Sequence, residues 1–141
     1  MIIPAERMKM RRVHVVPLAP FSVALIREQM ARVGGHGYLF PNRNDRSKPM
    51  SDGAINKGLE QLGYAGRQTG HGFRHIFSTE LNERGYPEDY VDAQLAHKKK
   101  GTAGVYNKAA YLKQRRAILE AWANDIASMI ETTSPAIDPA H

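Results

Sequence analysis

The first eighteen residues show an extended pattern rather than a helical one. An apolar segment from Ile2 leads into a basic turn at residues 9–12, and a second extended stretch, VHVVPL, is closed by Pro17. This pattern predicts a β-hairpin over residues 2–18. A lone hairpin is only marginally stable in water. We therefore expect its partner strands to come from an N-terminal part absent from this chain or from a neighbouring chain.

From Ala19 onward, apolar residues recur at the three- and four-residue spacing of amphipathic helices. The glycine pair 34–35 ends the first predicted helix, Ser51 is placed to cap the second, and Gly85 ends the third. The loop between the first two helices is rich in Pro, Asn, Asp and Arg. The predicted helices cover residues 21–33, 52–64, 70–85, 87–97 and 111–130.

The apolar stripes of the second and third helices define the expected core. Its members are Ile55, Leu59, Leu62, Phe73, Ile76, Phe77 and Leu81. The fold class is therefore mainly α with a small N-terminal β-hairpin, an α+β arrangement in one domain over residues 1–130 with its helical part at 19–130. Residues 131–141 are expected to be a disordered tail.

Composition narrows the range of partners. The 141 residues hold 20 Lys and Arg against 14 Asp and Glu, a net charge of +6, which favours a polyanionic partner. There is no cysteine, so disulfides and thiolate metal sites are excluded. Neither an 18-residue apolar run nor the apolar core of a signal peptide is present, and we expect a soluble cytoplasmic protein without a membrane partner.

The sequence HGFRH concentrates charge on one helical turn. His71, Arg74 and His75 stand at positions i, i+3 and i+4, so their side chains point to one side of the helix. A guanidinium matches two phosphate oxygens, and His71 can exchange a proton near neutral pH. The alternative is a purely structural role, in which His71 caps the helix and Arg74 makes a surface ion pair. For His75 we expect a partly buried, hydrogen-bonded imidazole.

The same two histidines resemble half of a zinc site. In a two-histidine zinc helix the residue after the first histidine is Glu, but here it is Gly72, and the intervening Arg74 would repel a dication. No metal is therefore expected.

A third imidazole, His97, is followed nine residues later by Tyr106, with Lys98, Lys99 and Lys100 between them. His97 could simply cap a helix C-terminus, and Tyr106 could pack in the core. The three lysines would ordinarily form a solvated run, although beside DNA they would neutralise phosphates.

These features, in this order, resemble the catalytic domain of tyrosine recombinases. They are H-x-x-R on a helix, LAH at the end of the next helix, a tyrosine nine residues after that histidine, and an upstream basic hairpin ending in VVPL. More narrowly, ERMKMRRVHVVPL, GHGFRH and YNKAAYLKQRRAILEAWAN resemble phage and island integrases of the P4 type. The resemblance extends from about Ile3 to Asn124.

The resemblance implies site-specific recombination of double-stranded DNA at attachment sites. A tyrosine hydroxyl attacks a phosphodiester, forms a 3′-phosphotyrosine and frees a 5′-hydroxyl, without metal, nucleotide or other cofactor. Tyr106 would be the nucleophile and Arg74 would clamp the phosphate. His71 and His97 would assist by hydrogen bonding and proton transfer, and Lys9 would protonate the leaving oxygen.

The resemblance also bears on DNA contacts and on a rival nucleophile. The cations expected to contact DNA are Arg11, Arg12, Lys98, Lys99 and Lys100. Tyr111 competes with Tyr106, but it lies fourteen residues after His97, beyond the family's spacing, and opens the last helix.

The chain departs from the family in one catalytic group. Family members use two arginines, and the first lies upstream of the hairpin, where no arginine of this chain matches it. The core-binding domain is absent too. We therefore expect the C-terminal part of an integrase that is inactive alone. Two alternatives stay open: a non-catalytic DNA-binding remnant or regulator, and a helical interaction module with structural histidines.

The last helix carries an apolar stripe that must be buried against something. Its members are Ile118, Leu119, Trp122, Ile126 and Ile130. In the family, the segment after the nucleophile commonly docks on a neighbouring protomer in a tetramer on DNA, which implies self-association. Packing on the helix's own domain is an equally open reading.

Overall fold

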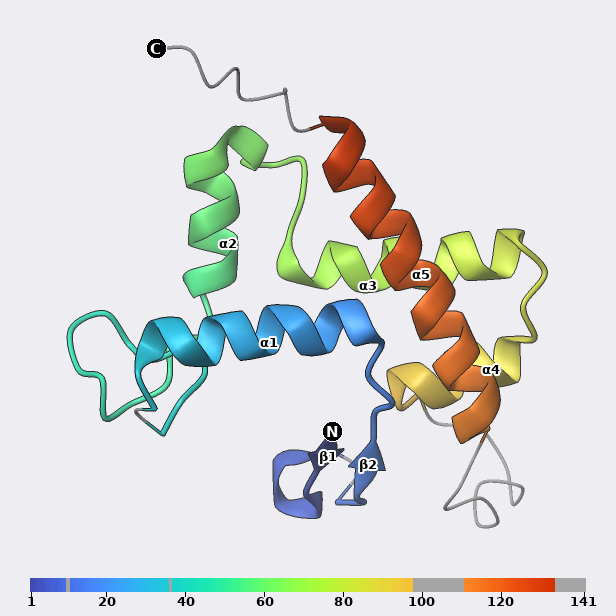
Figure 1. Ribbon diagram of the computed structural model, residues 1–141, viewed down its shortest axis with the longest axis horizontal. Helices are drawn as coiled ribbons and strands as arrows, with labels where there is room; N and C mark the ends of the chain where they lie inside the picture. The colour runs from blue at the N-terminus through green and yellow to red at the C-terminus, as the bar shows by residue number, and fades with distance from the viewer. Residues whose placement is uncertain (10, 36, 98–110, 134–141) are drawn as a thin grey trace. The chain divides into compact units, whose positions relative to one another are not determined.

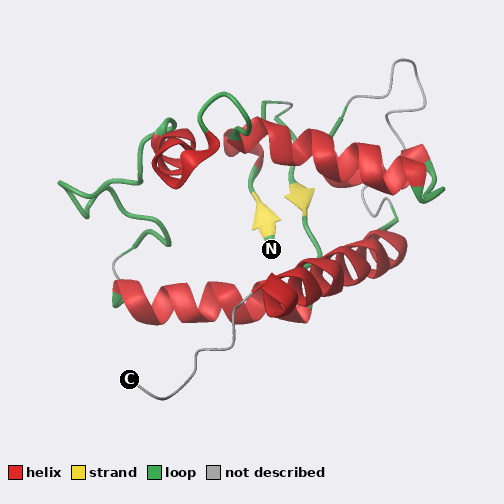
Figure 2. Cartoon of the chain, turned by 90° about the horizontal axis from the view of Figure 1, so that it is seen from above, coloured by secondary structure: helices red, strands yellow, loops and turns green. Residues whose placement is uncertain are grey.

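The computed structural model describes residues 1–9, 11–35, 37–97 and 111–133 of the chain. Over these residues, five α-helices and one two-stranded antiparallel sheet make up the regular structure, with a short 3₁₀ turn and a π-helical turn (Figures 1 and 2). This confirms the expected fold class, mainly α with a small N-terminal hairpin. The chain divides into two compact units, residues 1–25 with 98–141, and residues 26–97, which are described separately.

The hairpin of the first unit is smaller than its sequence pattern suggests. Strands β1 (Ile2–Ile3) and β2 (His14–Val15) have two residues each and pair antiparallel. A 3₁₀ turn at Ala5–Arg7 follows β1, and Arg11 adopts a left-handed backbone conformation with φ 50°. Both features take the chain out of extended geometry, so the ladder ends early. The predicted hairpin is present, but its strands are short.

Helix α5 (Leu112–Thr133) is tied to this hairpin by a buried arginine. Arg115 is almost fully buried, and its Nη2 atom donates a hydrogen bond of 2.6 Å to the carbonyl of Val15 in β2. Burial lowers the pKa of the guanidinium below its ordinary value. A partly buried carbonyl at a sheet edge needs a donor, and the arginine supplies one where a further strand would otherwise pair.

The apolar stripe of α5 divides into two parts. Ile118 is 2% exposed and Ala123 is buried, so the first half of the helix packs in the core. Further along, Ile126, Met129 and Ile130 are 37%, 62% and 52% exposed. Among the described residues, packing within the chain therefore covers only the first half of the stripe.

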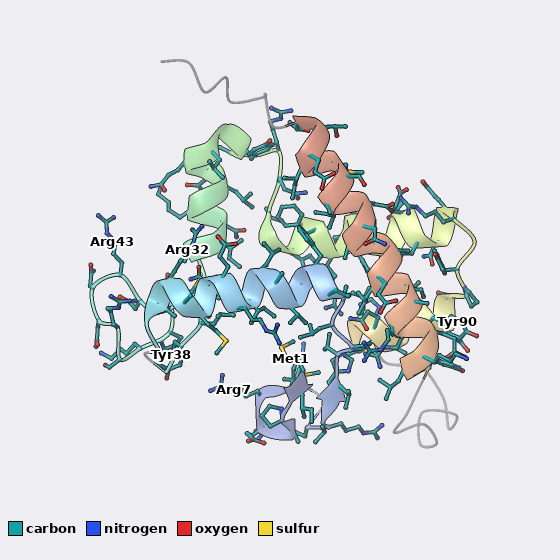
Figure 3. All side chains as sticks on the ribbon, viewed as in Figure 1. Met1, Arg7, Arg32, Tyr38, Arg43 and Tyr90 are labelled. Atoms are coloured by element: carbon teal, nitrogen blue, oxygen red, sulfur yellow. The ribbon has the colours of Figure 1, made fainter. Side chains whose placement is uncertain are left out.

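Helix α1 (Pro20–Val33) leads into the second unit. It ends at Gly34 and Gly35, whose φ angles of 70° and 77° are strained for residues with a Cβ. The following loop is held against the end of the helix, because the Arg46 side chain donates to the carbonyl of Val33 at 3.2 Å. Arg43, on the same loop, points outward (Figure 3).

The second predicted helix differs from expectation in its start and in its buried face. Helix α2 (Ala54–Leu59) begins after Gly53, and Ser51 contributes only its backbone carbonyl, so the prediction of a Ser51 side-chain cap was wrong. The chain continues as a π-helical turn, Glu60–Tyr64, and Leu62 is 74% exposed. The wider π turn breaks the α-helical phase and moves Leu62 off the expected stripe. Ile55 is also exposed.

Helices α3 (Gly70–Glu83) and α4 (Glu88–Leu95) contact each other and carry the rest of the core of this unit. Phe77, Leu81 and Val91 are buried, whereas Phe73 and Ile76 are about half exposed, against the prediction for those two. Gly85, with φ 77°, ends α3, and the amide of Tyr86 donates to the carbonyl of Leu81. This hydrogen bond, which spans six residues, is that of a Schellman motif, and Gly85 ends the helix as predicted.

Candidate functional site

The start of α3 is fixed by groups other than its histidines. The Thr69 hydroxyl accepts a hydrogen bond of 3.0 Å from the amide of Gly72, and the amide of Gly70 donates to Asn56 Oδ1 at 2.8 Å. These bonds satisfy two of the helix's free N-terminal amides. His71 is therefore not the N-cap of α3, and the alternative that this histidine caps the helix was wrong.

His71 and His75 lie one turn apart on the exposed side of α3. Their ring centroids are 4.8 Å apart, and the rings meet edge to face at 87°. Both side chains are exposed, so the expectation of a partly buried His75 was also wrong. The apolar residues that follow it do not cover the ring, because Ile76 faces outward as well.

Arg74 joins α3 to the end of α4. The residue is half-buried, and its Nη2 atom donates to the backbone carbonyl of Leu95 in the last turn of α4. Carbonyls in the last turn of a helix have no partner within the helix, and the C-terminal end carries partial negative charge, which favours a guanidinium. This contact brings the H-x-x-R turn and the L-A-H turn together.

His97 follows α4 in a tightly held turn. Ala96 adopts a left-handed conformation (φ 54°, ψ 34°), and the amides of Ala96 and His97 both donate to the carbonyl of Asp92. The carboxylate of Asp92 lies 2.9 Å from His97 Nδ1. The His97 side chain is 46% exposed, so the ring is held on one side and reaches solvent on the other.

The other expected site residues lie outside helices α3 and α4. Lys9, Arg11 and Arg12 lie in the hairpin turn of the first unit, and all three are exposed. Tyr111 is half-buried, and its carbonyl accepts a hydrogen bond from the amide of Arg115 near the start of α5. Tyr106 and Lys98–Lys100 lie outside the described residues.

Sequence reasoning missed three groups around these side chains: Thr69, Asp92 and the Leu95 carbonyl. Thr69 could have been found, because a Thr directly before a helical run is an N-cap signal. Asp92 could not, since residues five apart meet only when the helix ends between them. Alanine at position 96 gives no sign of that ending.

Within the described ranges, no group of three or more His, Asp and Glu side chains is placed to hold a metal ion. Across the described ranges, no helix combines the length and the apolar character that a membrane-spanning segment requires.

Comparison with known proteins defines the family. Residues 1–113 match the model of the phage integrase family. Over 138 residues, 97% of this chain, the sequence is 49% identical to prophage integrase IntZ of Escherichia coli K12, and it is 41% identical over 86% of the chain to prophage integrase IntA of the same strain. The integrase of enterobacteria phage P4 is 31% identical over 83% of the chain.

The chain belongs to the phage integrase family. The P4 match also confirms the narrower resemblance to integrases of that type. The chain spans about a third of the length of these relatives: 34% of IntZ, 30% of IntA and 28% of the P4 integrase. A comparison with solved structures found no match.

Proposed function

We propose that the chain is the C-terminal third of an integrase that recombines double-stranded DNA through a 3′-phosphotyrosine. The observation that carries the proposal is the bond from Arg74 to the Leu95 carbonyl, which holds two turns with the family's catalytic residue types against each other. An ordinary helical interaction module has no need to gather H-x-x-R and L-A-H in one place. A cytoplasmic location is part of the same proposal.

In this proposal Arg74 binds the scissile phosphate. A guanidinium has five N–H donors, and the Leu95 carbonyl engages one nitrogen. The remaining donors suit two non-bridging oxygens, whose negative charge grows as the phosphorus becomes five-coordinate. The helix contact also restricts the side chain before DNA arrives, so less conformational entropy is lost on binding.

The chemical step then needs a nucleophile and two proton transfers. The Tyr106 hydroxyl gives up its proton to an imidazole and attacks phosphorus, which breaks the bond to the 5′-oxygen. Lys9 protonates that departing oxygen. His71 and His97 take part through hydrogen bonds and proton transfer. The free 5′-hydroxyl of a partner strand reverses the step, expelling the tyrosine and restoring a phosphodiester.

The DNA backbone would be held by the cations of two segments. Arg11 and Arg12 are exposed in the hairpin turn, and Lys98–Lys100 follow the L-A-H turn in the sequence. Lys and Arg contacts of this kind neutralise phosphates and carry little sequence information. Recognition of the attachment site would then rest largely on the rest of the protein.

We further propose that these 141 residues bind DNA but do not cleave it alone. The family's first arginine has no counterpart here, and loss of one charge-stabilising donor costs about 100- to 1,000-fold in rate in comparable active sites. Self-association belongs to the same proposal. The exposed Ile126, Met129 and Ile130 at the end of α5 are the surface through which protomers of a tetramer would meet.

A chimera tests the function directly. The chain would replace the matching C-terminal third of prophage integrase IntZ, and a nicked attachment-site substrate would trap any covalent complex. We expect a trapped complex from the chimera and none from the chain by itself. Binding by the chimera without a covalent complex would instead support the non-catalytic remnant.

A further inference from the structure

We propose that Asp92 is the positioning residue for His97, an inference that rests on the proposed strand-transfer site. The bond between them joins Asp92 Oδ1 to His97 Nδ1 over 2.9 Å. A carboxylate can only accept a hydrogen bond, so Nδ1 must carry the proton. The second nitrogen, Nε2, is then the one left to act on a bound phosphate or tyrosine hydroxyl.

The backbone fixes the same residue a second time. The carbonyl of Asp92 accepts from the amide of His97 at 3.0 Å and also from the amide of Ala96. Asp92 therefore holds both the main chain and the ring of His97. With two fixed points, the imidazole loses much of its freedom to rotate about its side-chain bonds.

This turn is also the one that Arg74 contacts. Its guanidinium donates to the carbonyl of Leu95, and Leu95 lies between Asp92 and His97 in the chain. A change in the turn would therefore displace the arginine and the histidine together. Asp92, which does not contact the phosphate in this arrangement, would keep the spacing between two groups that do.

A simpler reading treats the Asp92–His97 bond as an ordinary surface ion pair. Exposed ion pairs contribute little to stability. The Asp92 side chain is 28% exposed and the His97 side chain 46% exposed, so this pair is partly open to solvent. The two readings differ in an observable. A surface ion pair forms with the charged ring, which is protonated on both nitrogens, and it need not persist once the ring is neutral. A positioning residue keeps its hydrogen bond to the neutral ring, so the remaining proton stays on Nδ1.

Nitrogen-15 NMR of the imidazoles in the full 141-residue chain separates the readings. His97→Gln assigns the His97 signals, and spectra are recorded at a pH where the ring is neutral. We expect the wild-type chain to show Nδ1 protonated and Nε2 bare. Asp92→Ala should shift the ring to the Nε2-protonated form that free histidine prefers, and Asp92→Glu should restore part of the Nδ1 form.

The matched control is Asp52→Ala, which removes an exposed carboxylate from the loop before α2 and should leave the His97 spectrum unchanged. A wild-type ring protonated on Nε2, or the same tautomer in wild type and Asp92→Ala, would overturn the proposal. So would an equal shift in the control.

Trapping in the IntZ chimera supplies the functional readout. Asp92→Ala should lower the cleavage rate about tenfold or more while DNA affinity stays unchanged, as expected for loss of a carboxylate that holds an active imidazole in one tautomer and orientation. An unchanged cleavage rate would overturn the positioning role. If the wild-type chimera forms no covalent complex, the proposed function fails. The NMR measurement still decides whether Asp92 determines the tautomer of the His97 ring.

Discussion

At the end of α4, Ala96 adopts a left-handed conformation although it carries a Cβ. Non-glycine residues are uncommon there, because the Cβ approaches the following carbonyl oxygen. The conformation allows the next amide, that of His97, to return to Asp92. The backbone of Ala96 is therefore strained at the turn that positions His97, and such strain is frequent near functional sites.

Replacing Ala96 by Gly should stabilise the protein. Glycine reaches positive φ without the Cβ clash, and we expect the free energy of unfolding to rise by about 0.5–1 kcal/mol in urea denaturation. The matched control is Ala93→Gly inside α4, which should lower the free energy of unfolding by about 1 kcal/mol. Destabilisation by Ala96→Gly would show that the left-handed turn does not form in solution.

Arg74 should matter far more for cleavage than for binding. In the IntZ chimera, Arg74→Ala removes the phosphate clamp, and we expect cleavage to fall by at least about 100-fold. DNA affinity should fall only severalfold, since one of several phosphate contacts is lost. Arg32→Ala, at a solvent-exposed i,i+4 ion pair with Glu28, is the control and should change neither quantity. Equal losses in DNA affinity and in cleavage rate would mean that Arg74 contributes to DNA binding and not to the chemical step.

At the scale of the elements, the sequence predicted helices well where apolar periodicity ends in a clear stop. The observed α1 and α3 end at the expected glycines, and α5 begins within one residue of its predicted start. Prediction failed where the backbone leaves regular helical geometry and the apolar pattern of the sequence does not mark the change. The π turn after Leu59 and the left-handed Ala96 are both of this kind, and the Asp92–His97 contact depends on the second.

The two halves of α5 should respond differently to substitution. Ile118→Ala leaves a cavity in the core and should lower the free energy of unfolding by about 2–5 kcal/mol. The double change Met129→Ser and Ile130→Ser alters exposed residues and should leave stability nearly unchanged but reduce self-association in sedimentation. A large loss of stability in the double variant, with the sedimenting mass unchanged, would mean that the distal half packs within its own chain.

For the molecule as a whole, charge would govern the first encounter with the proposed DNA partner. The net charge of +6 and the exposed cations of the hairpin turn favour association with any duplex. The sequence could predict this tendency and the residue types of the site. It could not predict how the parts of the site are held, because that depends on contacts such as Arg74 to Leu95 between two helices.

DNA binding by the chain should be weak and strongly dependent on salt. Each phosphate contact contributes a slope of about −0.9 to the plot of log K against log salt concentration. We expect Arg11→Ala with Arg12→Ala to reduce the slope by about 2, measured by fluorescence anisotropy at several salt concentrations. Affinity that is insensitive to salt would contradict a phosphate-based interface.

The proposed function requires that this chain supply the nucleophile of a tyrosine strand transferase. The most direct measurement is mass spectrometry of the covalent complex trapped by the IntZ chimera on a nicked attachment-site substrate, after digestion to peptides. We expect a nucleotide adduct on Tyr106 that disappears in Tyr106→Phe and persists in Tyr111→Phe. An adduct on Tyr111, or none on any residue of this chain while the chimera still binds DNA, would contradict it.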